Sequence, residues 1–341
     1  MLKHYFLAGI CVFTALAVSG RGDPPGLERF TFTEPHMGTL FKIVLYAPDE
    51  ATAKKAAKAA FERIAELNRI MSDYLQTSEL MQLCKKAGGD AVPVSKELFE
   101  ILEKAQEFSR KTDGALDVTI GPVVRLWRRA RRTRQLPSAE DLAAALKLVG
   151  NDKMKLDSKQ RTVQLLVAGM LLDLGAIAKG YAAEAAMAVL RQHGIRRALV
   201  AAGGDIFAGD PPPDAKGWKV GIAPLKNPDA PPTQYVLVAN AGVSTAGDAE
   251  QYVEIGGKRY SHIVDPKTGL GLTGRRSVTV IAPSGTTADA LDTGLCILGP
   301  ERGLPIVEAL DGVAALFVME TDKGIVTIPS KRFAQYEYRE K

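Results

Sequence analysis

Apolar residues recur every three or four positions in several segments of the first part of the chain, and this period predicts helices. In the longest segment Asp49 is a candidate N-cap. The apolar positions that share one side of this helix are Ala56, Ala60, Phe61, Ile64, Leu67 and Ile70. Ser95 and Ser138 are candidate N-caps of two further helices. The pattern predicts these and a fourth helix over residues 95–114, 138–150 and 179–194.

The second part of the chain contains short runs of β-branched and other apolar residues separated by Pro and Gly, which predict strands. With one earlier run they cover residues 41–47, 198–204, 218–224, 234–240, 252–265 and 275–283. A helix from Thr286 to about Leu298 precedes a hairpin over residues 312–329 that turns at residues 322–324. Because helices and strands do not alternate strictly, we expect an α+β fold with mixed or antiparallel sheets and packed helices.

The N-terminal residues have the layout of a secretory signal peptide. Lys3 precedes an apolar run from Phe6 to Val18, and small residues follow. We therefore expect a signal peptide over residues 1–22, a linker over residues 23–33 and one folded domain over residues 34–341, with an uncleaved N-terminal anchor as the alternative. Removal of the signal leaves two cysteines, Cys84 and Cys296, in apolar surroundings, which favours buried free thiols over a disulfide framework.

Positive charge is concentrated in one segment. The formal net charge is +5, and residues 125–134 contain six arginines, so the rest of the chain carries +5 − 6 = −1. Nucleic-acid binding is disfavoured, because an exported protein meets little nucleic acid. Two interpretations of the arginine segment stay open: a solvated helix face, or a docking surface for an acidic partner or anionic lipid, which would give peripheral contact with the inner membrane.

A strand-to-helix junction lies in residues 171–190. Asp173 and Lys179 place opposite charges there, with Gly175 and Gly180 between and beside them. A helix N-terminus offers free N–H groups and partial positive charge, and a nearby lysine adds a full charge, which suits a phosphate or pyrophosphate. The order of residues is not that of a Walker loop. An ordinary capped helix with a surface lysine is the alternative.

Two carboxylates and a hydroxyl share one face of the predicted helix that begins near Thr286. Asp289, Asp292 and Thr293 are three and four residues apart, so they lie close together near the helix start. Hard oxygen ligands select Mg²⁺ or Ca²⁺ over soft metals. A solvated acidic first turn, which the helix dipole also favours, is the alternative.

A histidine stands where a predicted strand leads into a turn, in residues 260–269. His262 is a candidate general base because its reference pKa lies near neutral pH, and a purely structural strand histidine is the alternative. Asp265, three residues later, is a second candidate base.

Seven segments of the chain resemble the bacterial flavin transferases, the FAD:protein FMN transferases of the ApbE type. They occur in the family's order between residues 34 and 320. The segments are PHMGT, MSDYLQTSEL, TDGALDVTIGPVVRLW, LLDLGAIAKGYA, AAGGDIFAGD, RYSHIVDPKTG and VTVIAPSGTTADALDTGLCILG. One departure is Ala246, where the family usually has serine, so no hydroxyl role is expected at that position.

The resemblance implies a site for FAD, with the active site in a cleft between two lobes. Positions that contact FAD in the family are matched here by Met37, Tyr74, Ala115, Leu116, Asp117, Asp173, Lys179 and Ile263. Its metal ligands are matched by Asp289, Asp292, Thr293 and the backbone carbonyl of Ala176. Asp173 and Lys179 would then hold the dinucleotide, and the peptide between them would lend an oxygen to Mg²⁺.

The resemblance also implies a reaction. FMN would be attached through a phosphoester bond to a threonine of an acceptor protein, with FAD as substrate and AMP as the other product. His262 is our candidate base. The acceptor would be a flavoprotein subunit of an exported or membrane redox system, and the enzyme would be periplasmic. Two alternatives use the same residues: a Mg²⁺-dependent FAD pyrophosphatase that gives FMN and AMP, and a non-catalytic periplasmic FAD-binding protein.

Overall fold

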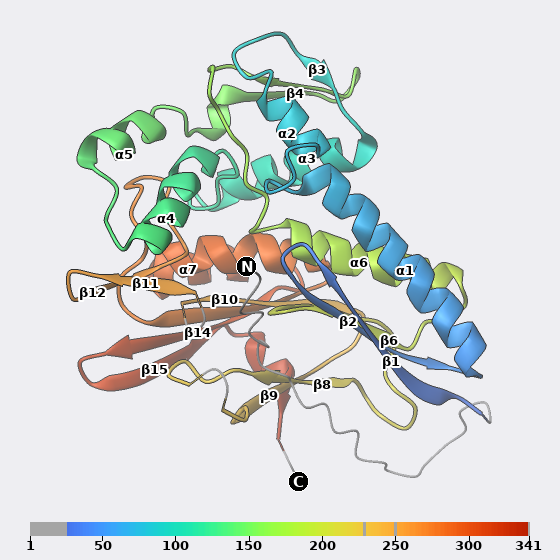
Figure 1. The fold of residues 1–341 in the computed structure, drawn as a ribbon. Coiled ribbons are helices and arrows are strands. Elements are labelled where there is room, and N and C mark those ends of the chain that lie inside the picture. Colours follow the sequence, from blue (N-terminus) through green and yellow to red (C-terminus); the bar gives the residue numbers. More distant parts are fainter. Residues whose placement is uncertain (1–25, 228–229, 249–250, 340–341) are drawn as a thin grey trace.

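The computed structural model describes residues 26–227, 230–248 and 251–339 and shows an α+β fold with helices packed over a large sheet (Figure 1). The sheet has eight strands, each antiparallel to its neighbours. In spatial order they are β1 (Glu28–His36), β2 (Thr39–Ala47), β6 (Ala198–Ala202), β7 (Asp205–Ala208), β10 (Ala241–Gly247), β13 (Arg276–Ala282), β14 (Ala314–Thr321) and β15 (Gly324–Pro329).

Three smaller sheets surround the large one, and their strand pairs are also antiparallel. One contains β16 (Glu337–Tyr338), β9 (Gln234–Val238) and β8 (Trp218–Ile222). Another contains β3 (Val92–Pro93), β5 (Thr162–Leu165) and β4 (Met154–Asp157). The third is the hairpin of β11 (Tyr252–Ile255) and β12 (Lys258–Ser261).

Seven α-helices occur in the described residues: α1 (Glu50–Met71), α2 (Glu79–Cys84), α3 (Lys96–Lys111), α4 (Gly121–Thr133), α5 (Ala139–Leu146), α6 (Ala178–Gln192) and α7 (Gly285–Glu308). The predicted N-caps of α1, α3 and α5 are confirmed, since each side chain accepts a hydrogen bond from a backbone N–H of the first turn. α7 is broken at Gly299, which adopts a φ of 72° and is followed by Pro300. Its first segment therefore ends near Leu298, where the sequence predicted.

Alternate residues of a strand point to opposite faces of the sheet, so each face has its own apolar core. Phe41, Ile43 and Leu45 of β2 pack beneath the helices. Val44 points the other way and packs in the core that contains Trp218 of β8. In Figure 1 the helices α1, α6 and α7 cover one face of the large sheet, and β8 and β9 lie on the other side.

The predicted fold class, with antiparallel sheets and packed helices, is confirmed. The predicted linker needs correction, because β1 begins at Glu28 and pairs along its whole length with β2, inside the segment 23–33. Residues 252–265 are a hairpin followed by a loop, because Gly256 and Gly257 both adopt a positive φ and turn the chain. The cleft between two lobes stays a prediction.

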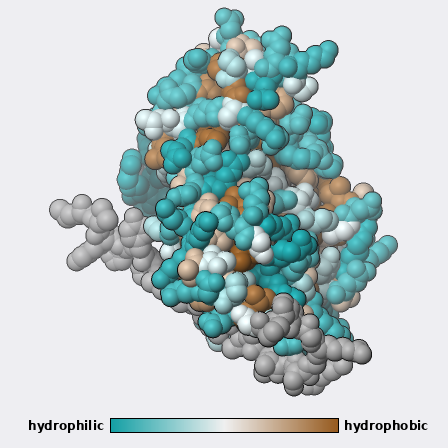
Figure 2. All heavy atoms as spheres, turned by 90° about the vertical axis from the view of Figure 1, so that its right-hand side faces the viewer, coloured by the Kyte–Doolittle hydropathy of each residue, from teal (hydrophilic) through white to brown (hydrophobic). Residues whose placement is uncertain are grey.

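The predicted signal peptide lies outside the described residues. Within them, no helix is long and apolar enough to cross a bilayer. Cys84 and Cys296 are buried free thiols, as predicted. Figure 2 views the molecule from the side where α1 lies, and the apolar spheres there are scattered among hydrophilic ones rather than joined in one patch.

A carboxylate cluster between strand β7 and helix α7

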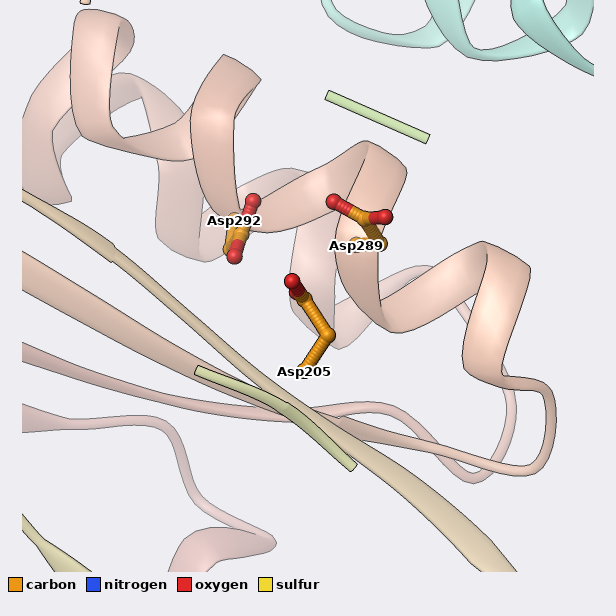
Figure 3. Close-up of side chains that lie close together, drawn as sticks. All are labelled: Asp205, Asp289 and Asp292. Atoms are coloured by element: carbon orange, nitrogen blue, oxygen red, sulfur yellow. The ribbon is translucent and has the colours of Figure 1, made fainter. Parts of the chain in front are cut away.

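Three carboxylates converge where α7 packs over the large sheet. Asp205 is the first residue of β7, after the two-residue turn at residues 203–204, and it points to the helix side of the sheet like Phe207. Asp289 and Asp292 are three residues apart on α7 and therefore share one side of the helix. One oxygen of each of the three carboxylates lies within 4.8 Å of the others (Figure 3).

Two glycines allow α6 and α7 to approach closely enough to build this cluster. A Cβ at Gly180 would lie 2.2 Å from the carbonyl oxygen of Gly285, so no other residue fits without a shift. The backbone N–H of Gly180 donates to Asp289 Oδ2 at 2.8 Å. The N-terminus of α6 has no side-chain cap, so a carboxylate from α7 takes that place. α6 is therefore capped by a carboxylate of another helix and not by a side chain of its own N-terminus.

Ser244, on strand β10 of the large sheet, contacts two of the carboxylates. Its hydroxyl contacts Asp205 Oδ1 and lies 2.5 Å from Asp292 Oδ2. A hydroxyl carries one proton and can donate to only one carboxylate. The second contact therefore requires that the other carboxyl carry a proton, or that a cation offset its charge.

The cluster is buried, and burial opposes negative charge. Burial, followed by the charge of Asp205, raises the pKa of Asp289 to about 7. Burial, followed by the charge of Asp289, raises the pKa of Asp292 well above its ordinary value. Without a cation these carboxyls therefore hold protons at a pH where exposed aspartates are ionised.

Lys179 supplies the one positive charge that contacts the cluster among the described residues. Its ammonium pairs with Asp205, and its side chain is 31% exposed. Burial alone would lower its pKa, but the charges of Asp205, Asp289 and Asp292 raise it above the ordinary value. It is therefore not a surface lysine. When all three carboxyls are ionised, as with a bound cation, the one lysine leaves them a formal charge of +1 − 3 = −2.

This donor set fits a hard divalent cation, because it is made of carboxylate and hydroxyl oxygens with uncompensated negative charge. Of the predicted ligands, Asp289, Asp292 and Thr293 lie together, since Thr293 Oγ1 donates to Asp292 Oδ1 at 3.1 Å. Ala176 lies in the loop that leads into α6, three residues before Lys179. A solvated acidic first turn is excluded for Asp289 and Asp292, which are 2% and 3% exposed.

A second group of charges surrounds Arg128 of α4. Its guanidinium lies 2.5 Å from Asp73 and 2.9 Å from Asp173, and it stacks over the exposed ring of Tyr74 at 4.1 Å from the ring centroid. Burial, followed by the charge of Asp73, raises the pKa of Asp173 to about 6. Asp173 also accepts a hydrogen bond from the N–H of Gly175 at 2.8 Å. Two of the predicted FAD contacts, Tyr74 and Asp173, are therefore brought together by one arginine.

His262 lies just after β12, and its ring Nδ1 is 3.0 Å from the backbone carbonyl oxygen of Gln251. A carbonyl only accepts, so Nδ1 carries the hydrogen and Nε2 of the neutral ring has a free lone pair. His262 is exposed to solvent, although protein packed close to the ring desolvates it. Desolvation, together with the charges of Arg131 and Lys179, lowers the pKa of His262 to about 4.

Asp265, the second candidate base, shapes a turn. Its Oδ1 accepts a hydrogen bond from the N–H of Lys267 at 2.8 Å, and its carbonyl accepts one from Gly269 at 2.8 Å. Its side chain is therefore already used locally.

The other predicted FAD contacts lie around these groups. Ala115, Leu116 and Asp117 are buried in the loop between α3 and α4, and Asp117 Oδ1 accepts two hydrogen bonds from Thr119. The loop packs on α7 at Gly294. A Cβ added to this glycine would lie 3.6 Å from the side chain of Leu116, which is van der Waals contact.

Met37 lies at the β1–β2 turn, and Ile263 is buried next to His262. Within the described part of the chain, no hydrogen bond or ion pair joins Met37 or Ile263 to the carboxylate cluster.

Three residues of the site were not predicted: Asp205, Ser244 and Arg128. Asp205 follows two glycines at the end of an apolar strand, which was a usable signal. Arg128 was hidden within the arginine run. Ala246 lies on the face of β10 that points to the helices and packs in the core there. The hydroxyl that faces α7 from this strand belongs to Ser244, two residues earlier.

Known proteins resemble the chain over most of its length. The model of the ApbE family matches residues 37–317. The protein named FAD:protein FMN transferase of Haemophilus influenzae is 33% identical, and the match covers 96% of this chain and 96% of that protein. Its namesake of Klebsiella pneumoniae is 31% identical, with 89% of this chain and 88% of that protein covered.

Solved structures agree with the sequence comparison. The flavin transferase ApbE from Vibrio cholerae superposes with a TM-score of 0.83 at 30% identity, covering 91% of this chain and 99% of that one. The flavinyl transferase ApbE of Pseudomonas stutzeri, in its apo form, superposes with a TM-score of 0.80 at 31% identity, covering 92% and 98% of the two chains.

Proposed function

Because the chain belongs to the ApbE family, we propose that it is a FAD:protein FMN transferase that attaches FMN to a threonine of an acceptor protein and releases AMP. Relatives that carry this name match the chain over nearly their whole length, which supports the activity. The threonine and the phosphoester bond follow from the resemblance of the seven sequence segments to this family.

The observation that carries the proposal is the buried cluster of Asp205, Asp289 and Asp292 with Lys179 beside it. A protein that only stores FAD has no use for three buried carboxylates with uncompensated charge. A pyrophosphate needs both a divalent cation, which carboxylates bind, and a direct cationic partner, which a lysine provides. These two needs explain the opposite charges next to one another at the start of α6.

The residues that fit Mg²⁺ are Asp289 and Asp292, with the hydroxyl of Thr293 and the backbone carbonyl of Ala176 as the further ligands. When bound there, the ion would neutralise charge on the pyrophosphate and stabilise the leaving group. Arg128 pairs with Asp173, which precedes the N-terminus of α6, and stacks on the ring of Tyr74. It therefore fixes the orientation of two groups that we propose contact FAD. Lys179 is our proposed partner for the phosphate oxygens.

In the proposed reaction the threonine oxygen forms a bond to the phosphorus on the riboflavin side. The bond from that phosphorus to the bridging oxygen breaks, and AMP leaves with the oxygen. The hydroxyl proton passes to a base, for which we propose Nε2 of His262. The hydrogen bond from Nδ1 to Gln251 fixes the required tautomer. The low pKa keeps the ring neutral, and the negative charge of bound FAD would raise it towards a value suited to a base.

One experiment separates the proposal from its alternatives. The purified protein is incubated with FAD, Mg²⁺ and the envelope fraction of its native host, and products are followed by in-gel flavin fluorescence and by chromatography of nucleotides. A fluorescent protein band with stoichiometric AMP is the expected result. Free FMN with AMP and no labelled protein would identify a pyrophosphatase, and unchanged FAD would identify a binding protein.

We also propose that the protein acts in the periplasm, on a flavoprotein subunit of an exported or membrane redox system. The support is the signal-peptide layout of residues 1–22, with Lys3 before an apolar run. Cell fractionation of the native host with an antibody against the chain tests this. Full-length, unprocessed protein in the cytosolic fraction would contradict it.

A further inference from the structure

Five of the six arginines of residues 125–134 lie in α4, and Arg134 is its C-cap. Arg128 and Arg131 are half-buried and face the site, where Arg128 pairs with two aspartates and Arg131 donates to Gln251 Oε1 at 3.5 Å. Three further arginines, Arg125, Arg129 and Arg132, are exposed and are four and three residues apart, so they share one side of the helix. We call it the arginine face, and it consists of Arg125, Arg129 and Arg132, with Arg134 at the helix end.

The arginine face has no partner in the described part of the chain. None of its four arginines forms an ion pair there, and α4 contains no acidic residue. The acidic residues nearest in sequence are Glu140 and Asp141, which begin α5. Two other long helices pair many of their lysines locally: Lys54 and Lys58 of α1 pair with glutamates one turn away, as do the lysines of α3.

Like charges one turn apart destabilise an isolated helix by about 0.2–0.5 kcal/mol per pair. Arg125, Arg129 and Arg132 have this spacing, so the chain bears a cost that an anionic partner would remove. All six cations are arginines and none is lysine, and the guanidinium fork binds carboxylates in bidentate fashion. A hollow of about 30 Å³ between α4 and α5, lined in part by Arg129 and Asp141, has room for a water or two but not for a side chain. Recognition at this face therefore depends on charge rather than on a pocket.

The position of the arginine face points to one occupant. α4 contacts β11, which leads through β12 to His262, and its inward side holds Asp173 (Figure 1). Arg128 follows Arg125 by three residues and precedes Arg132 by four, so the exposed arginines are its neighbours on the helix surface, with Cβ atoms about 5–6 Å apart. The acceptor residue that brings its hydroxyl to these groups is flanked by further residues of the acceptor chain. These flanking residues pass α4.

We infer that the arginine face of α4 docks an acidic segment of the acceptor protein, next to the residue that receives FMN. This inference rests on the proposed function, because it needs a protein acceptor. The segment carries Asp or Glu residues that pair with Arg125, Arg129 and Arg132. Docking increases the rate of productive encounter through electrostatic attraction and leaves the chemistry of a bound acceptor unchanged.

The test uses a triple variant, Arg125→Gln, Arg129→Gln and Arg132→Gln. Glutamine is nearly as good a helix former as arginine, so α4 should persist, and a melting curve checks this. The matched control removes three charges from α1 on another side of the molecule, by Lys54→Gln, Lys55→Gln and Lys58→Gln. The acceptor is the envelope protein that the wild type labels with flavin, purified from the native host.

The triple variant should raise the KM for the acceptor by about tenfold to a hundredfold at low ionic strength, with kcat and FAD affinity within about twofold of wild type. Added salt should reduce the difference, because screening weakens the wild-type attraction. The α1 control should behave like the wild type. An unchanged KM, or an equal rise in the control, would overturn the inference.

Two further outcomes are kept distinct. If the variant loses binding to vesicles of phosphatidylglycerol while its KM for the acceptor is unchanged, the face contacts lipid and the inference is wrong. If the wild type labels no envelope protein, the proposed function itself fails. The first result combines the vesicle binding and the KM of the variant, and the second is read from the wild type alone.

Discussion

The carbonyl oxygen of Gly285 lies 2.2 Å from the point where a Cβ would stand at Gly180. This contact lets the first turns of α6 and α7 touch, so that the Gly180 N–H reaches Asp289. The carboxylate cluster therefore depends on two positions that carry no side chain.

Gly180→Ala should separate the two helices and lower the free energy of unfolding by about 1–3 kcal/mol, as overpacking does in well-packed interiors. It should also weaken the binding of Mg²⁺, because Asp289 moves with α7. Urea unfolding and a metal titration measure the two effects. Ala188→Ser, which adds one atom to the exposed side of the same helix, should change neither. Wild-type stability in Gly180→Ala would show that the contact is not needed.

Asp289→Asn should abolish most transfer and remove the increase in melting temperature that Mg²⁺ gives the wild type. Asp289 is one of the two carboxylates that we propose bind the ion, so its replacement by an amide removes one of two charged ligands. Asp90→Asn, at an exposed aspartate, is the control. Full turnover of the wild type in excess chelator would contradict the metal assignment.

Metal-free protein should lose stability as pH rises from about 4 to about 7. The pKa of Asp289 is raised to about 7 and that of Asp292 is also raised, so the folded state binds more protons than the unfolded state in this window. Stability then falls with pH, because its slope follows the difference in protons bound by the unfolded and folded states. Urea unfolding in chelator at several pH values measures this, and Mg²⁺ should reduce the decline. A rise in stability over the same window would refute the assignment.

Lys179→Ala should weaken FAD binding about tenfold to a hundredfold, which corresponds to a charge-assisted hydrogen bond of about 1.5–3 kcal/mol. It should also lower the stability of the ligand-free protein, because the lysine pairs with buried Asp205. Lys55→Ala, on the exposed side of α1, is the control. A fluorescence titration with FAD decides the first point, and equal affinities in variant and wild type would remove Lys179 from the proposed site.

His262→Ala should reduce transfer about 100- to 10,000-fold at saturating FAD while FAD still binds, because a general base acts only on the way to the transition state. His193→Ala makes the same chemical change on the exposed end of α6 and should have no effect. If His262 only supports the loop, the variant will instead melt earlier and keep a nearly normal rate when saturated.

The sequence alone determined most of the local structure. Helix periodicity, the N-caps Asp49, Ser95 and Ser138, and the breaks at Gly and Pro act within a few residues, so they can be read without the fold. The same is true of the one-face spacing of Asp289, Asp292 and Thr293, because three- and four-residue intervals on a helix fix which side chains are neighbours. The α+β class, with mixed or antiparallel sheets, followed from the order of these elements.

Only the tertiary structure decided which distant charges meet. Asp205 and Lys179 are 26 residues apart in sequence, and Ser244 reaches Asp292 across 48. Sequence spacing carries no information about such pairs, because β7, β10, α6 and α7 must first pack on one sheet. Arg128 belongs to the site for the same reason, although Arg125, Arg129 and Arg132 of the same run form no ion pair in the described residues. Burial then fixed the electrostatics, since a carboxylate has a raised pKa only where the fold excludes water.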